Sequence, residues 1–377
     1  MTQPLSRRQF ARTLGTGVGA AVLAPRLLDA RADAQVAQAA PEFPIRLDSN
    51  ENPYGPSATA IEAMTASQKV AARYPDAMEL EVMGAIAALH KVAPEQVLLG
   101  CGSGEILRMA DMAFLGPDKT VVAAEPTFEA VLDYARVTRA HPVKVPQTAD
   151  FRHDLNAMAA ACDSGPGLVY VCNPNNPTGT IVTRDELQRF LERVPRTTHV
   201  LLDEAYHHFV TDESYASGAE WIGAPNLVLV RTFSKIYGMA GMRLGYAVST
   251  RENIAAMREH LIWSNANAAV LQAALACLAD PELVPRQRAL NSEAREWLCR
   301  ELERDGRRYI RSHANFVMID VGGDVAPVID ALGKDRIKVG RKFPTMANWL
   351  RISIGTRAEM EAFVAGLRRH VPVARAA

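Results

Sequence analysis

Cysteine is scarce in this sequence, and its spacing argues against two kinds of site. The five cysteines are odd in number and none belongs to a C-x-x-C pair, which disfavours both a disulfide framework and a thiolate metal site. We therefore predict no metal site. We expect the cysteines to be small hydrophobic core residues; they are Cys101, Cys162, Cys172, Cys277 and Cys299.

An excess of one charge and a long hydrophobic run are also missing. The 42 lysines and arginines balance 42 aspartates and glutamates, so composition gives no reason to expect nucleic acid or an anionic membrane surface as a partner. No repeat of fixed period is present. The 377 residues, 48% apolar and 22% charged, suffice for an ordinary globular protein of two domains, or of one large core with a lobe.

The first 40 residues have the composition of an export signal. Ser6-Arg7-Arg8-Gln9-Phe10 precedes an apolar, glycine-rich run up to Ala24, and Ala30-Arg31-Ala32 offers an Ala-x-Ala cleavage site. The adjacent arginines resemble a twin-arginine signal, whose export machinery moves folded proteins, and the run is too short to be a stable membrane anchor. We expect a periplasmic or extracellular location, or a cytoplasmic one if this segment is only a disordered leader.

Short apolar strands alternate with helices through the middle of the chain. Alternation of this kind predicts an α/β fold with a mostly parallel central sheet covered on both faces. The expected strands are residues 96–99, 120–124, 168–172, 200–202, 227–230 and 244–248.

The pattern changes beyond about residue 251, where a smaller α+β domain is expected. A long helical region, 252–304, is broken near Asp280-Pro281 and Pro285, and short strands and a final helix follow at 316–321, 337–339, 350–354 and 358–369. The predicted division is an export signal and Ala-rich leader, an N-terminal arm, a large domain and a small C-terminal domain, at residues 1–40, 41–72, 73–255 and 256–377.

A lysine follows the most apolar of these strands. Lys235 comes shortly after residues 227–230, at the carboxyl edge of the sheet, where ligands bind in open α/β folds. A buried ammonium is costly and its pKa falls, and the amine of such a lysine can form a Schiff base with a carbonyl compound. The alternative is that Lys235 only extends from a strand end to water.

Eight motifs, in order, resemble those of pyridoxal-phosphate-dependent aminotransferases of fold type I, and most of all the histidinol-phosphate aminotransferase branch. One such motif would be weak, but eight in order are specific. They are Asn50-Glu51-Asn52-Pro53, Arg73-Tyr74-Pro75-Asp76, Gly102-Ser103-Gly104-Glu105, Pro126-Thr127-Phe128, Asn173 to Gly179, Asp203-Glu204-Ala205-Tyr206, Arg231 to Lys235 with Arg243, and Leu350-Arg351-Ile352-Ser353.

The resemblance implies roles around the ring of pyridoxal 5'-phosphate. Lys235 would bind the cofactor covalently and then shuttle the substrate proton. Asp203 would pair with the protonated pyridine nitrogen, its alternative being a helix N-cap. Tyr206 and Asn176 would donate hydrogen bonds to the phenolic oxygen of the ring, and Phe128, otherwise a core aromatic, would stack on its face.

The cofactor phosphate would bind where a glycine-rich turn begins a helix. Gly102, Ser103 and Gly104 supply backbone N–H groups there, and the helix dipole favours an anion. By resemblance, Thr232, Ser234 and Arg243 complete this phosphate cup.

Further residues would bind the substrate and link two subunits. Arg351 resembles the arginine that grips the substrate carboxylate through a bidentate fork, unless it is a surface arginine; Asn52 joins it as a substrate residue. Tyr74, unless it is an ordinary turn residue, would reach the phosphate of a neighbouring subunit, which implies a homodimer with shared active sites.

One segment departs from the family. Histidinol-phosphate enzymes usually carry a Val-Arg pair in the strand before the Arg351 strand, and that arginine grips the substrate phosphate. Here Gly340 follows Val339, and Arg341 comes one residue later. Because a one-residue slip in a strand reverses the face of a side chain, Arg341 reaches the pocket as a substrate residue only if a bulge restores its direction.

Together these residues predict a transaminase that moves an amino group between an L-amino acid, or an amino-alcohol phosphate, and a 2-oxo acid such as 2-oxoglutarate. A decarboxylase, racemase or carbon–sulfur lyase of the same fold is the first alternative, because the same cofactor serves those reactions. An exported binding protein that closes on a ligand is the second, and it leaves Lys235 and Asp203 unexplained.

Overall fold

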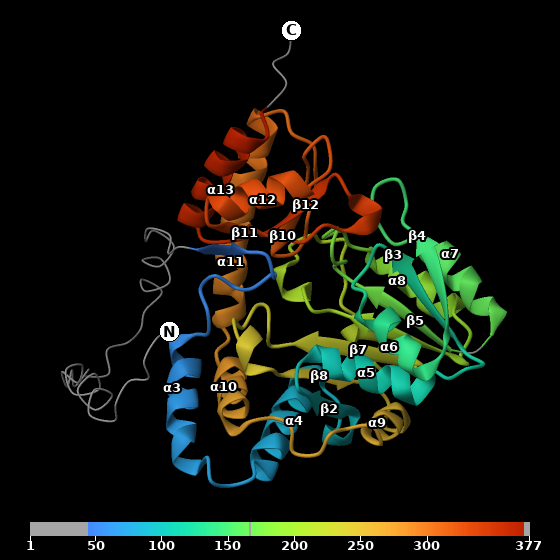
Figure 1. The fold of residues 1–377 in the computed structure, drawn as a ribbon. Helices are drawn as coiled ribbons and strands as arrows, with labels where there is room; N and C mark the ends of the chain where they lie inside the picture. Colours follow the sequence, from blue (N-terminus) through green and yellow to red (C-terminus); the bar gives the residue numbers. More distant parts are fainter. Residues whose placement is uncertain (1–43, 166, 373–377) are drawn as a thin grey trace, which may run out of the picture.

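The larger domain is built on a seven-stranded sheet in the order β2-β8-β7-β6-β5-β3-β4 (Figure 1). The computed structural model describes residues 44–165 and 167–372, so the predicted leader lies outside the described residues. Strand β8 is antiparallel to both of its neighbours, β2 and β7, whereas every other pair in this sheet is parallel, which confirms the predicted mostly parallel sheet. The strands are Val97–Gly100 (β2), Gly245–Val248 (β8), Leu227–Thr232 (β7), Thr198–Asp203 (β6), Gly167–Cys172 (β5), Thr120–Glu125 (β3) and His141–Pro146 (β4).

Alternate strand residues enter two separate hydrophobic clusters, one on each face of this sheet. In β7, for example, Leu227 and Leu229 belong to one cluster, while Val228 and Val230 belong to the other. Both faces are therefore buried, which is why the strands are almost wholly apolar. One face is covered by α5 (Ser103–Phe114), α6 (Ala130–Thr138) and α9 (Arg251–Arg258); the other by α3 (Ala58–Ser67), α4 (Asp76–His90), α7 (Leu155–Ala161), α8 (Arg184–Arg193) and α10 (Ala268–Ala279).

Strand β4 was not predicted from the sequence. It carries Pro142 and Pro146 and is largely exposed, and it lies at the edge of the sheet beside β3. Proline is tolerated on an edge strand because a missing N–H there breaks no ladder inside the sheet.

The smaller domain has its own core around a three-stranded antiparallel sheet. Its strands are Tyr309–Ile310 (β9), Phe316–Asp320 (β10) and Trp349–Ser353 (β12), and its helices are Leu283–Arg304 (α11), Ala326–Lys334 (α12) and Arg357–His370 (α13). The N-terminal arm joins this domain, because β1 (Ile45–Leu47) pairs in parallel with β11 (Ile337–Val339) (Figure 1).

The predicted division at residue 255 needs a correction. The predicted break at Asp280-Pro281 is confirmed, since it separates α10 from α11, but Pro285 lies inside α11, and a further break at residues 259–267 separates α9 from α10. Helix α10 packs against α3 and α4. Val270 and Leu271 of α10 are fully buried in the core of the larger domain. The residues of α11 belong to the core of the smaller domain only from Ala294 onward.

Three of the five cysteines, Cys162, Cys172 and Cys277, are buried as predicted, whereas Cys101 is exposed and Cys299 is half-buried. Within the described ranges, no group of His, Cys, Asp and Glu side chains is arranged to hold a metal ion. No single helix there has the length and apolarity of a membrane span; only the sharply bent pair α10 and α11, taken together, passes that test.

Candidate active site

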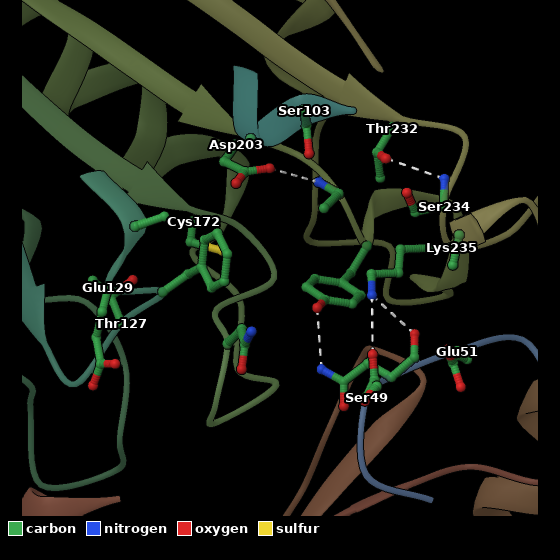
Figure 2. Close-up of a pocket in the computed structure, with 18 of the residues that line it drawn as sticks. Ser49, Glu51, Ser103, Thr127, Glu129, Cys172, Asp203, Thr232, Ser234 and Lys235 are labelled. Carbon is green, nitrogen blue, oxygen red and sulfur yellow. Dashed lines mark hydrogen bonds between the residues drawn. The ribbon is translucent and has the colours of Figure 1, made fainter. Parts of the chain in front are cut away.

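A cleft of about 530 Å³ opens at the carboxyl edge of the large sheet and is lined by residues of both domains and of the arm. A cleft of this size is typical of a small-molecule site. Every candidate residue from the sequence lines it except Gly102, Asn52 and Tyr74. Figure 2 shows Asp203, Ser103, Thr232, Ser234 and Lys235 arranged around this one cavity.

Lys235 points inward rather than out to water. Its Nζ donates to the carbonyl oxygens of Asn50, at 3.0 Å, and Ser49, at 3.3 Å (Figure 2). Burial, together with the positive charge of Arg351, lowers the pKa of Lys235 to about 8. Near physiological pH, more of this amine is therefore neutral than in an exposed lysine, and the neutral amine is the form that attacks a carbonyl carbon.

Asp203 ends β6 beneath the cleft and is 3% exposed. Its carboxylate accepts hydrogen bonds from the Tyr170 hydroxyl at 2.9 Å and from the Ala205 N–H at 3.0 Å. Burial raises its pKa to about 6, although both hydrogen bonds act in the opposite direction. A cation placed against this buried carboxylate would be stabilised strongly. Asp203 caps no helix, since the next helical turn starts at His207 after Tyr206.

Behind the cleft, a buried ion pair fixes the ends of β6 and β7. Arg231 donates to Glu204 Oε2 from Nη2 at 2.9 Å and from Nε at 3.2 Å, and the two side chains are 7% and 0% exposed. Glu204 also accepts from the Gly218 N–H at 2.6 Å and from Ser217 Oγ at 2.8 Å. Since Glu204 follows Asp203 directly, this network holds the Asp203 backbone in place.

Tyr206 and Asn176 each have one hydrogen-bonding role taken and one left for the cleft. The Tyr206 hydroxyl accepts from Asn50 Nδ2 at 3.1 Å, so its own proton is available to donate. Asn176 Oδ1 accepts from Arg351 Nη1 at 2.7 Å, which leaves its amide N–H groups as donors. Both residues can therefore donate a hydrogen bond to an acceptor in the cleft, as the family resemblance of the sequence motifs implied.

Arg351 is held rigidly by contacts on two sides. Besides Asn176, its Nη2 donates to the carbonyl oxygen of Asp48 at 2.9 Å, and the residue is only 9% exposed. Burial lowers the pKa of its guanidinium, but not enough to remove the charge at neutral pH. A buried, oriented guanidinium of this kind suits a carboxylate or a phosphate group.

The start of α5 and the loop after β7 form an anion-binding cup. Ser103 begins α5, and Arg243 Nη1 donates to Ser234 Oγ at 3.3 Å. Gly102 has φ +81°, and a Cβ there would lie 2.1 Å from Arg243 Nη2. Only glycine lets the guanidinium lie against the turn. Gly102 therefore shapes the cup from behind, although it does not line the cleft.

Besides Gly102, two predicted site residues, Asn52 and Tyr74, do not line the cleft. Asn52 turns away from it, since its Nδ2 donates to the Ile236 carbonyl oxygen at 3.0 Å and to Gln287 Oε1 at 3.1 Å; this corrects the substrate role expected for it. The arm asparagine that does line the cleft is Asn50. Tyr74 is 85% exposed on the turn before α4.

The sequence did not predict the contacts of three residues that support the site, Tyr170, Glu204 and Asn50. Tyr170 lies within an entirely buried strand, and its hydroxyl could not be distinguished from core aromatics. Glu204 and Asn50 lie inside recognised motifs, but their partners belong to segments distant in sequence.

The comparison with known proteins identifies the family. The model of "Aminotransferase class I and II" matches residues 44–367. The chain belongs to this family. Aminotransferases that resemble it include a histidinol-phosphate aminotransferase of Moorella thermoacetica, 40% identical over 86% of this chain and 84% of that protein. Histidinol-phosphate aminotransferase 2 of Ralstonia nicotianae is 39% identical over 88% of this chain and 90% of that protein.

A solved structure shares the fold. The histidinol-phosphate aminotransferase of Sinorhizobium meliloti, in complex with pyridoxal-5'-phosphate, has a TM-score of 0.82 and 25% sequence identity, covering 93% of this chain and 98% of that one. The predicted fold type I is thereby confirmed.

The aminotransferase cofactor is pyridoxal 5'-phosphate, and the cleft fits it. The buried Asp203 carboxylate matches a pyridinium nitrogen, the glycine-backed cup of Ser103, Ser234 and Arg243 matches a phosphate, and the inward amine of Lys235 matches an aldehyde. When bound, the cofactor supplies an electron sink for the carbanion formed at the substrate carbon. Phe128, 40% exposed on the cleft wall, offers an aromatic face for the ring.

Proposed function

We propose that this aminotransferase transfers the amino group of an L-amino acid, or of an amino-alcohol phosphate such as histidinol phosphate, to a 2-oxo acid such as 2-oxoglutarate. The observation that carries the proposal is that the Lys235 amine and the fixed Arg351 guanidinium line one cleft. Arg351 would orient the substrate by a carboxylate or phosphate, and Lys235 would receive and return the proton of the amine-bearing carbon. The two closely similar histidinol-phosphate aminotransferases support this substrate class.

The proposal is tested by a half-reaction without an acceptor. Holoenzyme mixed with a stoichiometric amount of donor should lose its visible absorption and release one 2-oxo product, and 2-oxoglutarate should then restore the absorption. A panel of donors that includes histidinol phosphate, L-glutamate and L-phenylalanine would identify the substrate. Release of CO₂, or product formed repeatedly with no acceptor, would point instead to a decarboxylase or lyase.

We also propose that two copies of the chain form a homodimer in which Tyr74 reaches the neighbouring site. Tyr74 is joined by other exposed apolar side chains, among them Ile262, 60% exposed, and Trp263, 84% exposed. Ser264 Oγ lies 3.3 Å from Asp76 Oδ1, so the segments that carry Trp263 and Tyr74 are neighbours. An exposed apolar surface of this kind is typical of an interface.

The dimer is checked by light scattering and by one substitution. Wild type should have twice the mass of the chain, and Tyr74→Phe should weaken retention of the cofactor while the dimer persists. A monomer with full activity would contradict the proposal.

We further propose that the chain is exported by the twin-arginine machinery, on the basis of Arg7, Arg8 and Phe10. Replacing both arginines by lysine should retain the protein in the cytoplasm, as measured by fractionation. Unchanged export of that variant would argue against this route, and a wild-type protein found only in the cytoplasm would leave the segment as a leader without that function.

A further inference from the structure

An ion pair crosses the rim of the cleft and joins the two domains. Arg341, in the loop after β11, donates from Nη2 to Glu129 Oε2 at 2.5 Å. Glu129 is the residue immediately before α6 of the larger domain, and Figure 2 shows it across the cavity from Lys235. Both residues line the cleft. The pair therefore lies at the exposed edge of the same cleft that Arg351 lines.

Gly340 explains why the rim cation comes from position 341. The Gly340 N–H donates to the Arg351 carbonyl oxygen at 2.9 Å. A Cβ on Gly340 would lie 2.7 Å from that oxygen and 3.1 Å from the Arg351 Cβ, so no side chain fits at this position without movement of the backbone. Because β11 ends at Val339, the next residue is free of strand alternation and Arg341 reaches the cleft after all.

The two arginines of the cleft both lie close to one aromatic ring. The guanidinium carbon of Arg341 is 4.4 Å from the centre of the Phe343 ring, and that of Arg351 is 5.3 Å from it. Their closeness also contributes to lowering the pKa of Arg351. Two cations on one ring suit a ligand that carries two anionic groups a few carbon atoms apart.

The two arginines differ in how firmly they are held. Arg351 is buried and bound on two sides, whereas the side chains of Arg341 and Glu129 are 54% and 49% exposed. An exposed ion pair changes the equilibrium between its paired and unpaired states by only a few-fold. A ligand anion can therefore displace Glu129 from Arg341 at a small cost in free energy. The other carboxylate on that wall, Asp133, pairs with Arg136 and does not take part in this exchange.

We propose that Glu129 is a specificity-determining residue that competes with the distal anion of the substrate for Arg341. Donors with a second carboxylate or a phosphate displace Glu129 and bind Arg341, while donors with uncharged side chains leave the rim pair closed over Phe343. This rests on the proposed function, since it assigns the distal half of the same substrate site.

The test measures binding to the holoenzyme and does not need turnover. Isothermal titration compares glutarate, which has two carboxylates, with pentanoate, which has one and the same chain length. Glu129→Gln should raise the affinity for glutarate about threefold to fivefold and leave the affinity for pentanoate unchanged. Arg341→Gln should lower the affinity for glutarate at least fivefold. In the double variant the gain from Glu129→Gln should vanish. Asp133→Asn is the matched control and should change neither affinity.

Three outcomes overturn the inference. The first is that Glu129→Gln changes the affinities for glutarate and pentanoate equally. The second is that Glu129→Gln binds glutarate more weakly than wild type does. The third is that wild type does not prefer glutarate to pentanoate, or does not bind glutarate measurably. A holoenzyme that shows the predicted binding pattern but transaminates no donor would contradict the proposed function while leaving the role of Glu129 intact.

Discussion

Removing the charge of Glu204 tests whether the buried ion pair behind the cleft holds the site together. In Glu204→Gln, Arg231 loses the only carboxylate with which it forms an ion pair in the described part of the chain, and both side chains are almost fully buried. Breaking a buried pair from one side costs about 3–5 kcal/mol, because the remaining charge stays desolvated. The Gly218 N–H and Ser217 hydroxyl also lose a charged acceptor.

The measurement is urea unfolding of the holoenzyme beside a matched variant. Glu220→Gln breaks the pair between Arg184 and Glu220, whose side chains are 58% and 44% exposed, and should cost no more than about 1 kcal/mol. Because Asp203 precedes Glu204, we also expect kcat/KM to fall about 100-fold in Glu204→Gln, as misplacement of a catalytic group does.

A rescue experiment separates the charge from the packing. Replacing Glu204 and Arg231 together by methionine removes the desolvated charge and should recover most of the lost stability. If Glu204→Gln is no more destabilising than Glu220→Gln, or if the double substitution is as unstable as the single one, then the buried ion pair does not hold the site together.

Three further predictions concern other groups. Asp111 is fully buried on α5, and neither of its carboxyl oxygens has a hydrogen-bond partner among the described residues. Burial raises its pKa from 3.8 to about 8, so the fold favours the protonated form, and wild type should lose several kcal/mol of stability relative to Asp111→Asn as the pH rises from about 4 to about 8. Parallel profiles of stability against pH for the two proteins would contradict this. Because the pKa of Lys235 is about 8, the rate at which the apoenzyme takes up pyridoxal 5'-phosphate should rise with a midpoint near that pH in stopped-flow absorbance, and a midpoint above pH 10 would mean that the amine is not desolvated. Arg351→Lys keeps the charge but loses the planar fork, so kcat/KM for amino-acid donors should fall at least tenfold, whereas an unchanged value would remove Arg351 from the substrate site.

The sequence predicted best what depends on local pattern. Runs of apolar residues that end in polar ones located most strands of the sheet, and the carboxyl-edge rule placed Asp203 and Lys235 at one site because parallel strands share that edge. Both lie there in the structure. Strand β4 was missed because its prolines hide the pattern, and α10 was assigned to the wrong domain because a helix of apolar residues does not indicate which core it joins.

The sequence could not predict contacts made by irregular backbone. In the arm, Asn50 and Asn52 are two residues apart and no periodicity says which faces the cleft; the answer depends on the partners Tyr206 and Gln287, far away in the chain. Arg341 posed the same problem, because its direction depends on where β11 ends. Its pairing with Glu129 joins two domains across 212 positions, a relation that local pattern does not contain.

Borohydride reduction of the holoenzyme tests whether Lys235 carries the cofactor of a transaminase. The visible absorption should disappear, and mass spectrometry should find one reduced pyridoxyl phosphate group per chain, on the peptide that contains Lys235. Lys235→Ala should be colourless after dialysis and unable to transaminate. A reduced adduct on another lysine, or a Lys235→Ala protein that transaminates as fast as wild type, would show that Lys235 does not carry the cofactor.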